Sequence, residues 1–265
     1  MTTNDSAFAG SIPGLYDRFL GPLLFEPYAK LAADRARALR PRRILETAAG
    51  TGIVTEALHQ ALPDAEIVAT DLNQAMLEVA AGRIGSDEVV LQVADAQELP
   101  FSDGEFDLVV CQFGVMFYPD RVRGNAEARR VLREGGHYLL LVWDTLAKNP
   151  VSNTIHGIVA DLFPDDPPQF LARTPYGYAD RSAIERDLRA AGFSSIEIET
   201  VAAAGTMVSG HDAVQGLVAG SPLRGEIEER DPAGVDRVVE KVSVEIGDGS
   251  GLDTSLSAHI VTATR

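Results

Sequence analysis

Three acidic side chains follow short apolar segments in the first hundred residues of the chain. Glu46, Asp71 and Asp95 each stand at or just after the end of such a segment. If the segments are parallel strands, their carboxyl ends meet at the edge where α/β sheets bind ligands. Three carboxylates at one edge disfavour a pyrophosphate. They suit a ligand that carries an ammonium group, ribose hydroxyls and a base with an amino group.

The first of these acids opens a loop of small residues. The segment from Ile44 to Gly52 reads ILETAAGTG, so an apolar strand leads directly into a predicted helix. Small residues let a ligand approach the backbone closely, and the unpaired N–H groups of a helix N-terminus attract a carboxylate or phosphate. Asp71 lies 19 residues after Gly52, where an acid can accept hydrogen bonds from ribose hydroxyls. The pattern predicts a ligand that contains a nucleoside.

Two ligand classes fit that pattern. The dinucleotide fingerprint G-x-G-x-x-G/A, started at Gly50, requires glycine or alanine at position 55, where the chain has Thr55. S-adenosylmethionine carries an ammonium, a ribose, an amino-bearing base and a positive sulfonium, and it has no phosphate. The residues therefore favour S-adenosylmethionine. An NAD-dependent oxidoreductase of Rossmann type and a non-catalytic S-adenosylmethionine-binding domain are the alternatives.

The elements that must position these residues alternate along the chain. Expected strands are 43–46, 66–70, 89–93, 107–111, 137–143, 195–201 and 258–264, and expected helices are 25–39, 51–62, 73–81, 125–133, 181–191, 211–219 and 235–246. Strand–helix alternation predicts an α/β fold with a doubly wound, mostly parallel, Rossmann-like sheet of seven strands. The last two strands are expected to form an antiparallel edge hairpin.

The chain is expected to be a single domain of 265 residues. Its predicted parts are a helical leader (1–40), a cofactor-binding core (41–145), a proline-rich cap insertion (146–180) and a C-terminal part of the sheet with its helices (181–265). The Gly135-Gly136 pair is expected to end the helix over 125–133. No internal repeat or low-complexity tract interrupts this order.

Composition excludes several partners. The net charge is −16, and neither half of the chain is basic, which argues against nucleic acid and against an anionic membrane surface. The longest apolar stretches fall far short of the roughly 20 residues that cross a bilayer, and no secretory signal is expected. Cys111 is the single cysteine, so a cytoplasmic setting and no metal cluster are predicted. The oligomeric state leaves no signal in the sequence.

Four segments in series carry a family resemblance. They are ILETAAGTG, VATDLNQAM, VADAQELPFSDGEFDLVVCQFGVMFYPD and LREGGHYLLLVWD, and together they span about 43–144. They resemble the motifs of class I S-adenosylmethionine-dependent methyltransferases, in particular the branch of ubiquinone/menaquinone-biosynthesis C-methyltransferases. Ala48 and Ala49 replace the commoner Gly-Cys pair of the first motif, so a slightly displaced loop is expected. After Thr145 the similarity is only architectural.

This resemblance implies roles for individual residues. Glu46 would orient the methionine amino group, Asp71 would bind the ribose, and Asp95 would accept a hydrogen bond from the adenine amino group. Cys111 and Gln112 would border the departing methyl. The full set that the resemblance assigns to the cofactor is Glu46, Thr47, Ala48, Ala49, Gly50, Thr51, Gly52, Asp71, Leu72, Met76, Asp95, Ala96, Cys111 and Gln112.

Methyl transfer from a sulfonium is an in-line displacement that depends on positioning in a dry site. An oxygen or nitrogen acceptor also needs a general base, for which the candidates are Tyr16, Gln112, Asp144 and His156. Tyr16 is favoured as a lid residue. Aromatic residues in the leader, in 113–120 and in 146–180 predict a small, partly apolar acceptor, with O-, N- and C-methylation left open.

Overall fold

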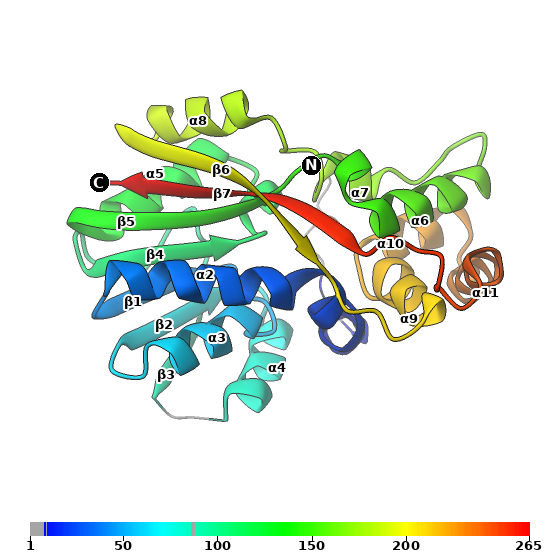
Figure 1. The fold of residues 1–265 in the computed structure, drawn as a ribbon, viewed down its shortest axis with the longest axis horizontal. Coiled ribbons are helices and arrows are strands. Elements are labelled where there is room, and N and C mark those ends of the chain that lie inside the picture. Colours follow the sequence, from blue (N-terminus) through cyan, green and yellow to red (C-terminus); the bar gives the residue numbers. More distant parts are fainter. Residues whose placement is uncertain (1–7, 9, 86–87) are drawn as a thin grey trace.

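The computed structural model describes residue 8 and residues 10–85 and 88–265. Seven strands form one sheet in the order β3-β2-β1-β4-β5-β7-β6 (Figure 1). The strands are β1 (Arg43–Thr47), β2 (Glu66–Asp71), β3 (Val89–Val93), β4 (Phe106–Gln112), β5 (Leu132–Trp143), β6 (Ser195–Ala204) and β7 (Ser255–Thr264).

The first five strands run parallel. β7 lies between β5 and β6 and is antiparallel to both. The predicted α/β sheet with an antiparallel edge is therefore confirmed. The strand order turns at β1, because β1 pairs with β2 on one side and β4 on the other. In sheets of this kind, ligands bind beyond the carboxyl ends of the strands at that switch point.

Helices cover both faces of the sheet (Figure 1). They include α2 (Glu26–Leu39), α3 (Ile53–Ala61), α4 (Gln74–Ile84), α5 (Arg121–Val131) and α8 (Arg181–Ala190). The central strands are buried almost throughout; Leu108, Val109 and Val110 of β4 have no exposed surface. A near-continuous apolar run is what a parallel strand covered by helices on both sides requires.

The leader is helical from Ile12 to Leu39. It comprises α1 (Ile12–Leu15), the π-helix η1 (Tyr16–Phe25) and α2. Residues 1–7 and 9 of the predicted leader lie outside the described residues. Beyond β5, a second group of helices gathers at one end of the sheet (Figure 1). They are η3 (Leu146–Lys148), α6 (Pro150–Asp161), α7 (Phe170–Arg173), α9 (Gly210–Val214), η4 (Gln215–Ala219), α10 (Leu223–Arg230) and α11 (Val235–Ile246).

Two local predictions need correction. The helix expected over 125–133 runs from Arg121 to Val131, because Asp120 accepts a hydrogen bond from the Arg123 N–H and so caps it four residues earlier. Gly135 and Gly136 do not end that helix, since both lie within β5. The role of the proline-rich stretch 146–180 as a cap stays a prediction. The stretch contains η3, α6 and α7, and Pro150 stands in the first turn of α6, where its missing N–H has no helical partner to lose.

Candidate functional site

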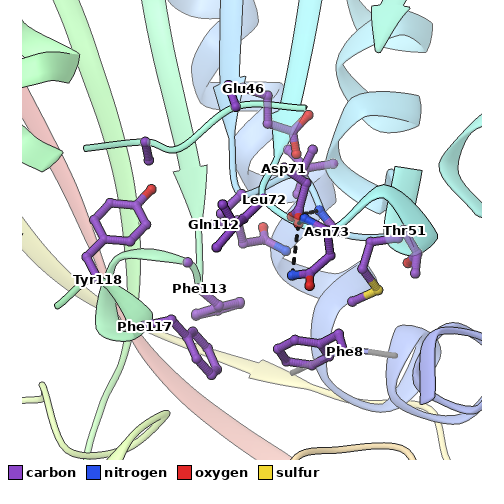
Figure 2. Close-up of a pocket in the computed structure, with 18 of the residues that line it drawn as sticks. Phe8, Glu46, Thr51, Asp71, Leu72, Asn73, Gln112, Phe113, Phe117 and Tyr118 are labelled. Carbon is purple, nitrogen blue, oxygen red and sulfur yellow. Dashed lines mark hydrogen bonds between the residues drawn. The ribbon is translucent and has the colours of Figure 1, made fainter. Parts of the chain in front are cut away.

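A cavity opens at the carboxyl ends of the central strands, at the switch point. It holds about 1150 Å³ free of protein atoms, its open mouth included. Its wall includes Glu46, Asp71 and Asp95, so the structure brings the three predicted acids to one place. Figure 2 shows the carboxylates of Glu46 and Asp71 on one side of the cavity and the ring of Phe117 across from them.

The small-residue loop after β1 owes its path to left-handed backbone conformations. The φ angles are 53° at Ala48, 57° at Gly50 and 78° at Gly52. Glycine adopts such angles freely, whereas an alanine there costs about 1 kcal/mol. A Cβ on Gly50 would meet only the Met76 Cε at 3.9 Å, but a Cβ on Gly52 would lie 2.9 Å from the Ala80 Cβ. Gly50 therefore faces open space, while Gly52 lets α3 pack closely on α4.

Glu46 is the deepest acid of the cavity. Its side chain is 1% exposed, and its Oε2 accepts a hydrogen bond of 2.7 Å from the Thr55 hydroxyl. Burial raises the pKa of Glu46 to about 8; the Thr55 hydrogen bond opposes this rise and the nearby Asp71 carboxylate adds to it. Thr55, which departs from the dinucleotide fingerprint, therefore orients the Glu46 carboxyl group at the end of β1.

Asp71 is held by the backbone around it. Its Oδ2 accepts from the Gly50 N–H at 2.9 Å and its Oδ1 from the Asn73 N–H at 2.8 Å. Burial raises the pKa of Asp71, and these hydrogen bonds act against the rise. Asn73 precedes α4 but makes no side-chain cap to it. Asp71 therefore links the glycine loop to the end of β2 and fixes the position of both at the cavity wall.

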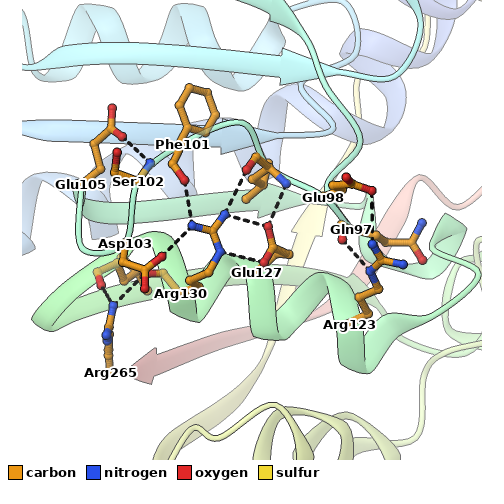
Figure 3. A network of polar contacts seen from close by, with 12 residues as sticks. Gln97, Glu98, Phe101, Ser102, Asp103, Glu105, Arg123, Glu127, Arg130 and Arg265 are labelled. Atoms are coloured by element: carbon orange, nitrogen blue, oxygen red, sulfur yellow. Dashed lines mark hydrogen bonds and ion pairs between the residues drawn. The ribbon is translucent and has the colours of Figure 1, made fainter.

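The loop that carries Asp95 and Ala96 is fixed from outside the cavity (Figure 3). Arg130 on α5 donates hydrogen bonds to the carbonyl oxygens of Leu99 at 2.9 Å and Phe101 at 2.7 Å. Glu127 pairs with Arg130 at 2.8 Å and accepts from the Leu99 N–H at 2.8 Å. Charge-assisted hydrogen bonds of this kind are strong. The rigid helix therefore sets the position of the loop.

Most of the cofactor residues predicted from the sequence line the cavity. These are Glu46, Ala48, Ala49, Gly50, Thr51, Asp71, Leu72, Met76, Asp95, Ala96 and Gln112. The remaining three, Thr47, Gly52 and Cys111, do not. Thr47 and Cys111 lie behind the wall against the Tyr118 hydroxyl. Burial raises the pKa of the Cys111 thiol, so it is packed as a small apolar residue.

Two polar atoms of the wall are buried without a hydrogen-bond partner among the described residues. They are the Thr51 Oγ1 and the Gln112 Oε1. Gln112 is 9% exposed, and its Nε2 donates to the Phe25 carbonyl at 3.2 Å. An unpaired buried polar atom costs about 1–3 kcal/mol. Both atoms belong to residues that line the cavity, which indicates that a ligand supplies their partners.

The four predicted catalytic candidates separate into two groups. Tyr16 and Gln112 line the cavity. Asp144 lines neither this cavity nor the second cavity described below. Its carboxylate accepts a hydrogen bond from the Ser257 hydroxyl at 2.8 Å. His156 also lies away from both, on α6, and burial lowers its pKa.

A second, more apolar cavity adjoins the first. It holds about 450 Å³ free of protein atoms and shares Phe8, Tyr16, Phe25, Phe113 and Phe117 with the first cavity. The remaining wall includes Trp143, Phe170, Leu171 and Tyr176. Trp143 stacks on Phe113 with ring centroids 3.7 Å apart and planes 1° from parallel, which gives a flat aromatic wall.

Several wall residues were not predicted as site residues. Phe8 and Phe25 come from the leader, and Asn73 follows Asp71. The sequence carried a weak signal for the leader residues, namely its aromatic content. Among the described residues, no group of three or more His, Cys, Asp or Glu side chains is placed to hold a metal ion. Within the same part of the chain, no helix is long and apolar enough to cross a membrane.

The fold and the cavity place the chain among α/β proteins that bind their ligand at the carboxyl ends of parallel strands. A family model described as a methyltransferase domain matches residues 45–140. The chain is 33% identical over 181 residues to the demethylmenaquinone methyltransferase of Clavibacter sepedonicus, covering 63% of this chain and 72% of that protein. It is 36% identical over 151 residues to the demethylmenaquinone methyltransferase of Deinococcus radiodurans, covering 56% of this chain and 61% of that protein.

Solved structures agree with these relatives in fold. Phosphoethanolamine N-methyltransferase 2 of Haemonchus contortus, in complex with S-adenosyl-L-methionine, superposes with a TM-score of 0.59 at 18% identity. The match covers 96% of this chain and 56% of that chain. The chain belongs to the class I S-adenosylmethionine-dependent methyltransferase family. The predicted enzyme class and cofactor are confirmed, and the alternative of an NAD-dependent oxidoreductase is not favoured.

Proposed function

We propose that this protein transfers a methyl group from S-adenosylmethionine to a ring carbon of a small quinol. One observation carries the proposal: an apolar, aromatic cavity shares five wall residues with the cavity that holds the three acids. Two relatives are named demethylmenaquinone methyltransferases, and a naphthoquinol is a flat, largely apolar ring. The Phe113–Trp143 pair suits such a ring.

The first cavity fits S-adenosylmethionine by the chemistry of its wall. We assign the methionine ammonium to Glu46 and to the unpaired Gln112 Oε1, because a cation needs buried acceptors. Asp71 would receive the ribose hydroxyls, and Leu72, which is 56% exposed although apolar, would pack on the nucleoside. Asp95 and the Ala96 N–H would meet the adenine edge. The cofactor supplies an electrophilic methyl group on a sulfonium.

The remaining predicted residues have supporting roles in this proposal. Ala48, Ala49, Gly50 and Thr51 would follow the methionine chain, and Met76 would pack under the nucleoside. Thr47, Gly52 and Cys111 would act only indirectly, through the packing of the loop and of β4. The small side chains of glycine and alanine leave space for the methionine chain of the cofactor to approach the protein backbone.

The acceptor cavity would act by orientation and by exclusion of water. Among the described residues of its wall, the ionisable side chains are Tyr16 and Tyr176. Burial raises the pKa of both phenols, so both keep their protons at neutral pH and are poor bases. This supports an electron-rich ring carbon as the nucleophile. The carbon–methyl bond forms while the sulfur–methyl bond breaks, so the sulfonium leaves as the neutral thioether S-adenosylhomocysteine. The methylated ring carbon then loses its proton to solvent water when the product leaves the cavity.

We propose further that the 265 residues act as one domain with a small-molecule acceptor, in the cytoplasm and without a nucleic-acid partner. The acidic net charge of −16 supports the last point, since nucleic-acid binding depends on Lys and Arg. The free, buried Cys111 is compatible with a reducing compartment.

Two experiments test the function. Calorimetric titration with S-adenosylhomocysteine, S-adenosylmethionine and NAD should give binding for the two sulfur ligands alone. Incubation with methyl-labelled S-adenosylmethionine and a naphthoquinol, a benzoquinol and a catechol should then label a ring carbon, which NMR distinguishes from a methoxy group. Binding of NAD alone would refute the cofactor assignment. Label found only on oxygen would refute carbon methylation.

A further inference from the structure

One arginine joins the leader to two helices of the core. Arg83, near the end of α4, places its Nη2 2.8 Å from the Asp17 Oδ1 and its Nη1 2.9 Å from the Glu56 Oε2. Asp17 belongs to η1 in the leader, whereas Glu56 belongs to α3. The three side chains are 20%, 25% and 34% exposed, respectively. The guanidinium therefore has two separate partners, and only one of them lies in the leader.

Asp17 is the neighbour of Tyr16, which stands in the wall common to both cavities. The Tyr16 ring stacks on Phe25 at 4.8 Å between centroids and meets Phe8 edge-on at 5.7 Å. A displacement of Asp17 would move Tyr16 and with it this small aromatic group. The ion pair is thus placed to control the partition between the two cavities.

The backbone of this segment needs such an anchor. η1 is a ten-residue π-helix with Pro22 inside it, and π-helices are rarely longer than a single turn. Proline has no N–H, so the helix loses one internal hydrogen bond there. Contacts with the rest of the protein must therefore hold its geometry. One contact is the hydrogen bond of 2.9 Å from the Thr206 N–H to the Pro22 carbonyl, and another, between charged groups, is the ion pair of Asp17 with Arg83.

We propose that Arg83 is a positioning residue for methyl transfer, which fixes Tyr16 between the cofactor and acceptor cavities through its ion pair with Asp17. The methyl-transfer role rests on the proposed function, whereas the anchoring of the leader does not. Glu56 holds the same guanidinium against α3 but touches no leader residue in the contacts described. Asp17 and Glu56 pair with the same guanidinium at 2.8 and 2.9 Å and are similarly exposed, so removing either carboxylate costs one partly exposed ion pair of the same kind.

The test compares Asp17→Ala with its matched control Glu56→Ala. Thermal unfolding, calorimetry with S-adenosylhomocysteine and hydrogen exchange of the amides over 12–25 are measured for both. We expect similar losses in Tm. Asp17→Ala alone should raise the Kd for S-adenosylhomocysteine by about three- to tenfold, the range of a partly exposed charged hydrogen bond, and should speed exchange of the leader amides. Asp17→Glu should restore part of both effects.

A third variant and the failure cases complete the design. Arg83→Met should weaken S-adenosylhomocysteine binding as Asp17→Ala does. The double variant Asp17→Ala/Arg83→Met should bind this ligand no more weakly than Arg83→Met, because both substitutions remove the same ion pair. Equal weakening of binding by Asp17→Ala and Glu56→Ala would overturn the proposal, as would unchanged binding and unchanged exchange in Asp17→Ala. If the wild-type protein fails to bind S-adenosylhomocysteine, the proposed function falls, while hydrogen exchange still decides whether Arg83 anchors the leader.

Discussion

Glu46 should make the free protein less stable as the pH rises, and Glu46→Gln should remove that effect. Burial raises the pKa of Glu46 from 4.5 to about 8 in the folded protein. Between these two values the unfolded chain has lost the proton and the folded protein still holds it. Unfolding then releases a proton, so the stability falls as the pH increases across this window. The contribution of Glu46 to stability is complete only below pH 4.5.

The size of the effect follows from the shift. Each pKa unit corresponds to about 1.4 kcal/mol, so a rise from 4.5 to about 8 amounts to about 5 kcal/mol of stability lost between pH 4.5 and pH 8. This is a large share of the 5–15 kcal/mol that is typical of a folded domain. Glutamine has nearly the same shape and does not titrate. Its amide oxygen can still accept the hydrogen bond from Thr55.

The assay is urea unfolding of both proteins at pH 5, 6, 7 and 8. Other groups titrate in both proteins, Asp71 included, so the difference between the two curves isolates Glu46. We expect Glu46→Gln to gain several kcal/mol on the wild type between pH 5 and pH 8. In Thr55→Val, the hydrogen bond that favours the charged form is absent, so the wild-type decline should extend to higher pH.

A difference that stays flat from pH 5 to pH 8 would refute this reasoning. It would mean that Glu46 is already ionised at pH 5, and hence that the hydrogen bond from Thr55 outweighs burial. Any folded pKa at or below 4.5 would give this flat result, because Glu46 would then be ionised in both the folded and the unfolded state throughout the range. The experiment needs no ligand, so its outcome is independent of the proposed methyl transfer.

Three further predictions concern the site and its support. Asp71→Ala should weaken S-adenosylhomocysteine by about 1–3 kcal/mol in calorimetry, the range of a hydrogen bond to a charged group; undiminished affinity would remove Asp71 from the proposed cofactor site. Gly52→Ala should lower Tm, because the φ of Gly52 is 78° and an added Cβ would lie 2.9 Å from the Ala80 Cβ. In the control Gly82→Ala the added Cβ has nothing within 4 Å, so this variant should stabilise α4 by about 1 kcal/mol. Equal Tm changes in the two variants would contradict the packing argument. Trp143 is the only tryptophan and lines the second cavity, so a naphthoquinol should change its fluorescence while a sugar of similar size should not.

The sequence was sufficient for the sheet and for the part of the site near the glycine loop. Apolar runs predicted each strand, and the acids at their ends, Glu46, Asp71 and Asp95, meet in one cavity. The acids could be placed together because the carboxyl ends of parallel strands lie at one edge of the sheet, independently of the conformation of the loops. The helix after β4 was misplaced because its cap, Asp120, was not recognised as its start.

The acceptor cavity could be predicted only in outline. The aromatic content of three segments indicated where it would form, and Phe113, Phe117 and Tyr176 do line it. Asp144, a predicted catalytic candidate, instead accepts a hydrogen bond from Ser257, 113 residues further along the chain. Glu226 stands among other acidic residues in the sequence, but its side chain is only 13% exposed and forms an ion pair with Arg173. Neither partner can be recognised from spacing.

The sequence by itself determined the seven strands, the glycine loop and the acids that surround the first cavity, because these depend on local residue patterns and on the regular geometry of a parallel sheet. Only the tertiary structure decided which leader residues close that cavity, that Thr55 holds Glu46, and that Arg83 joins Asp17 to Glu56. Such pairs depend on side-chain directions and on helix packing, which no local pattern of residue types encodes.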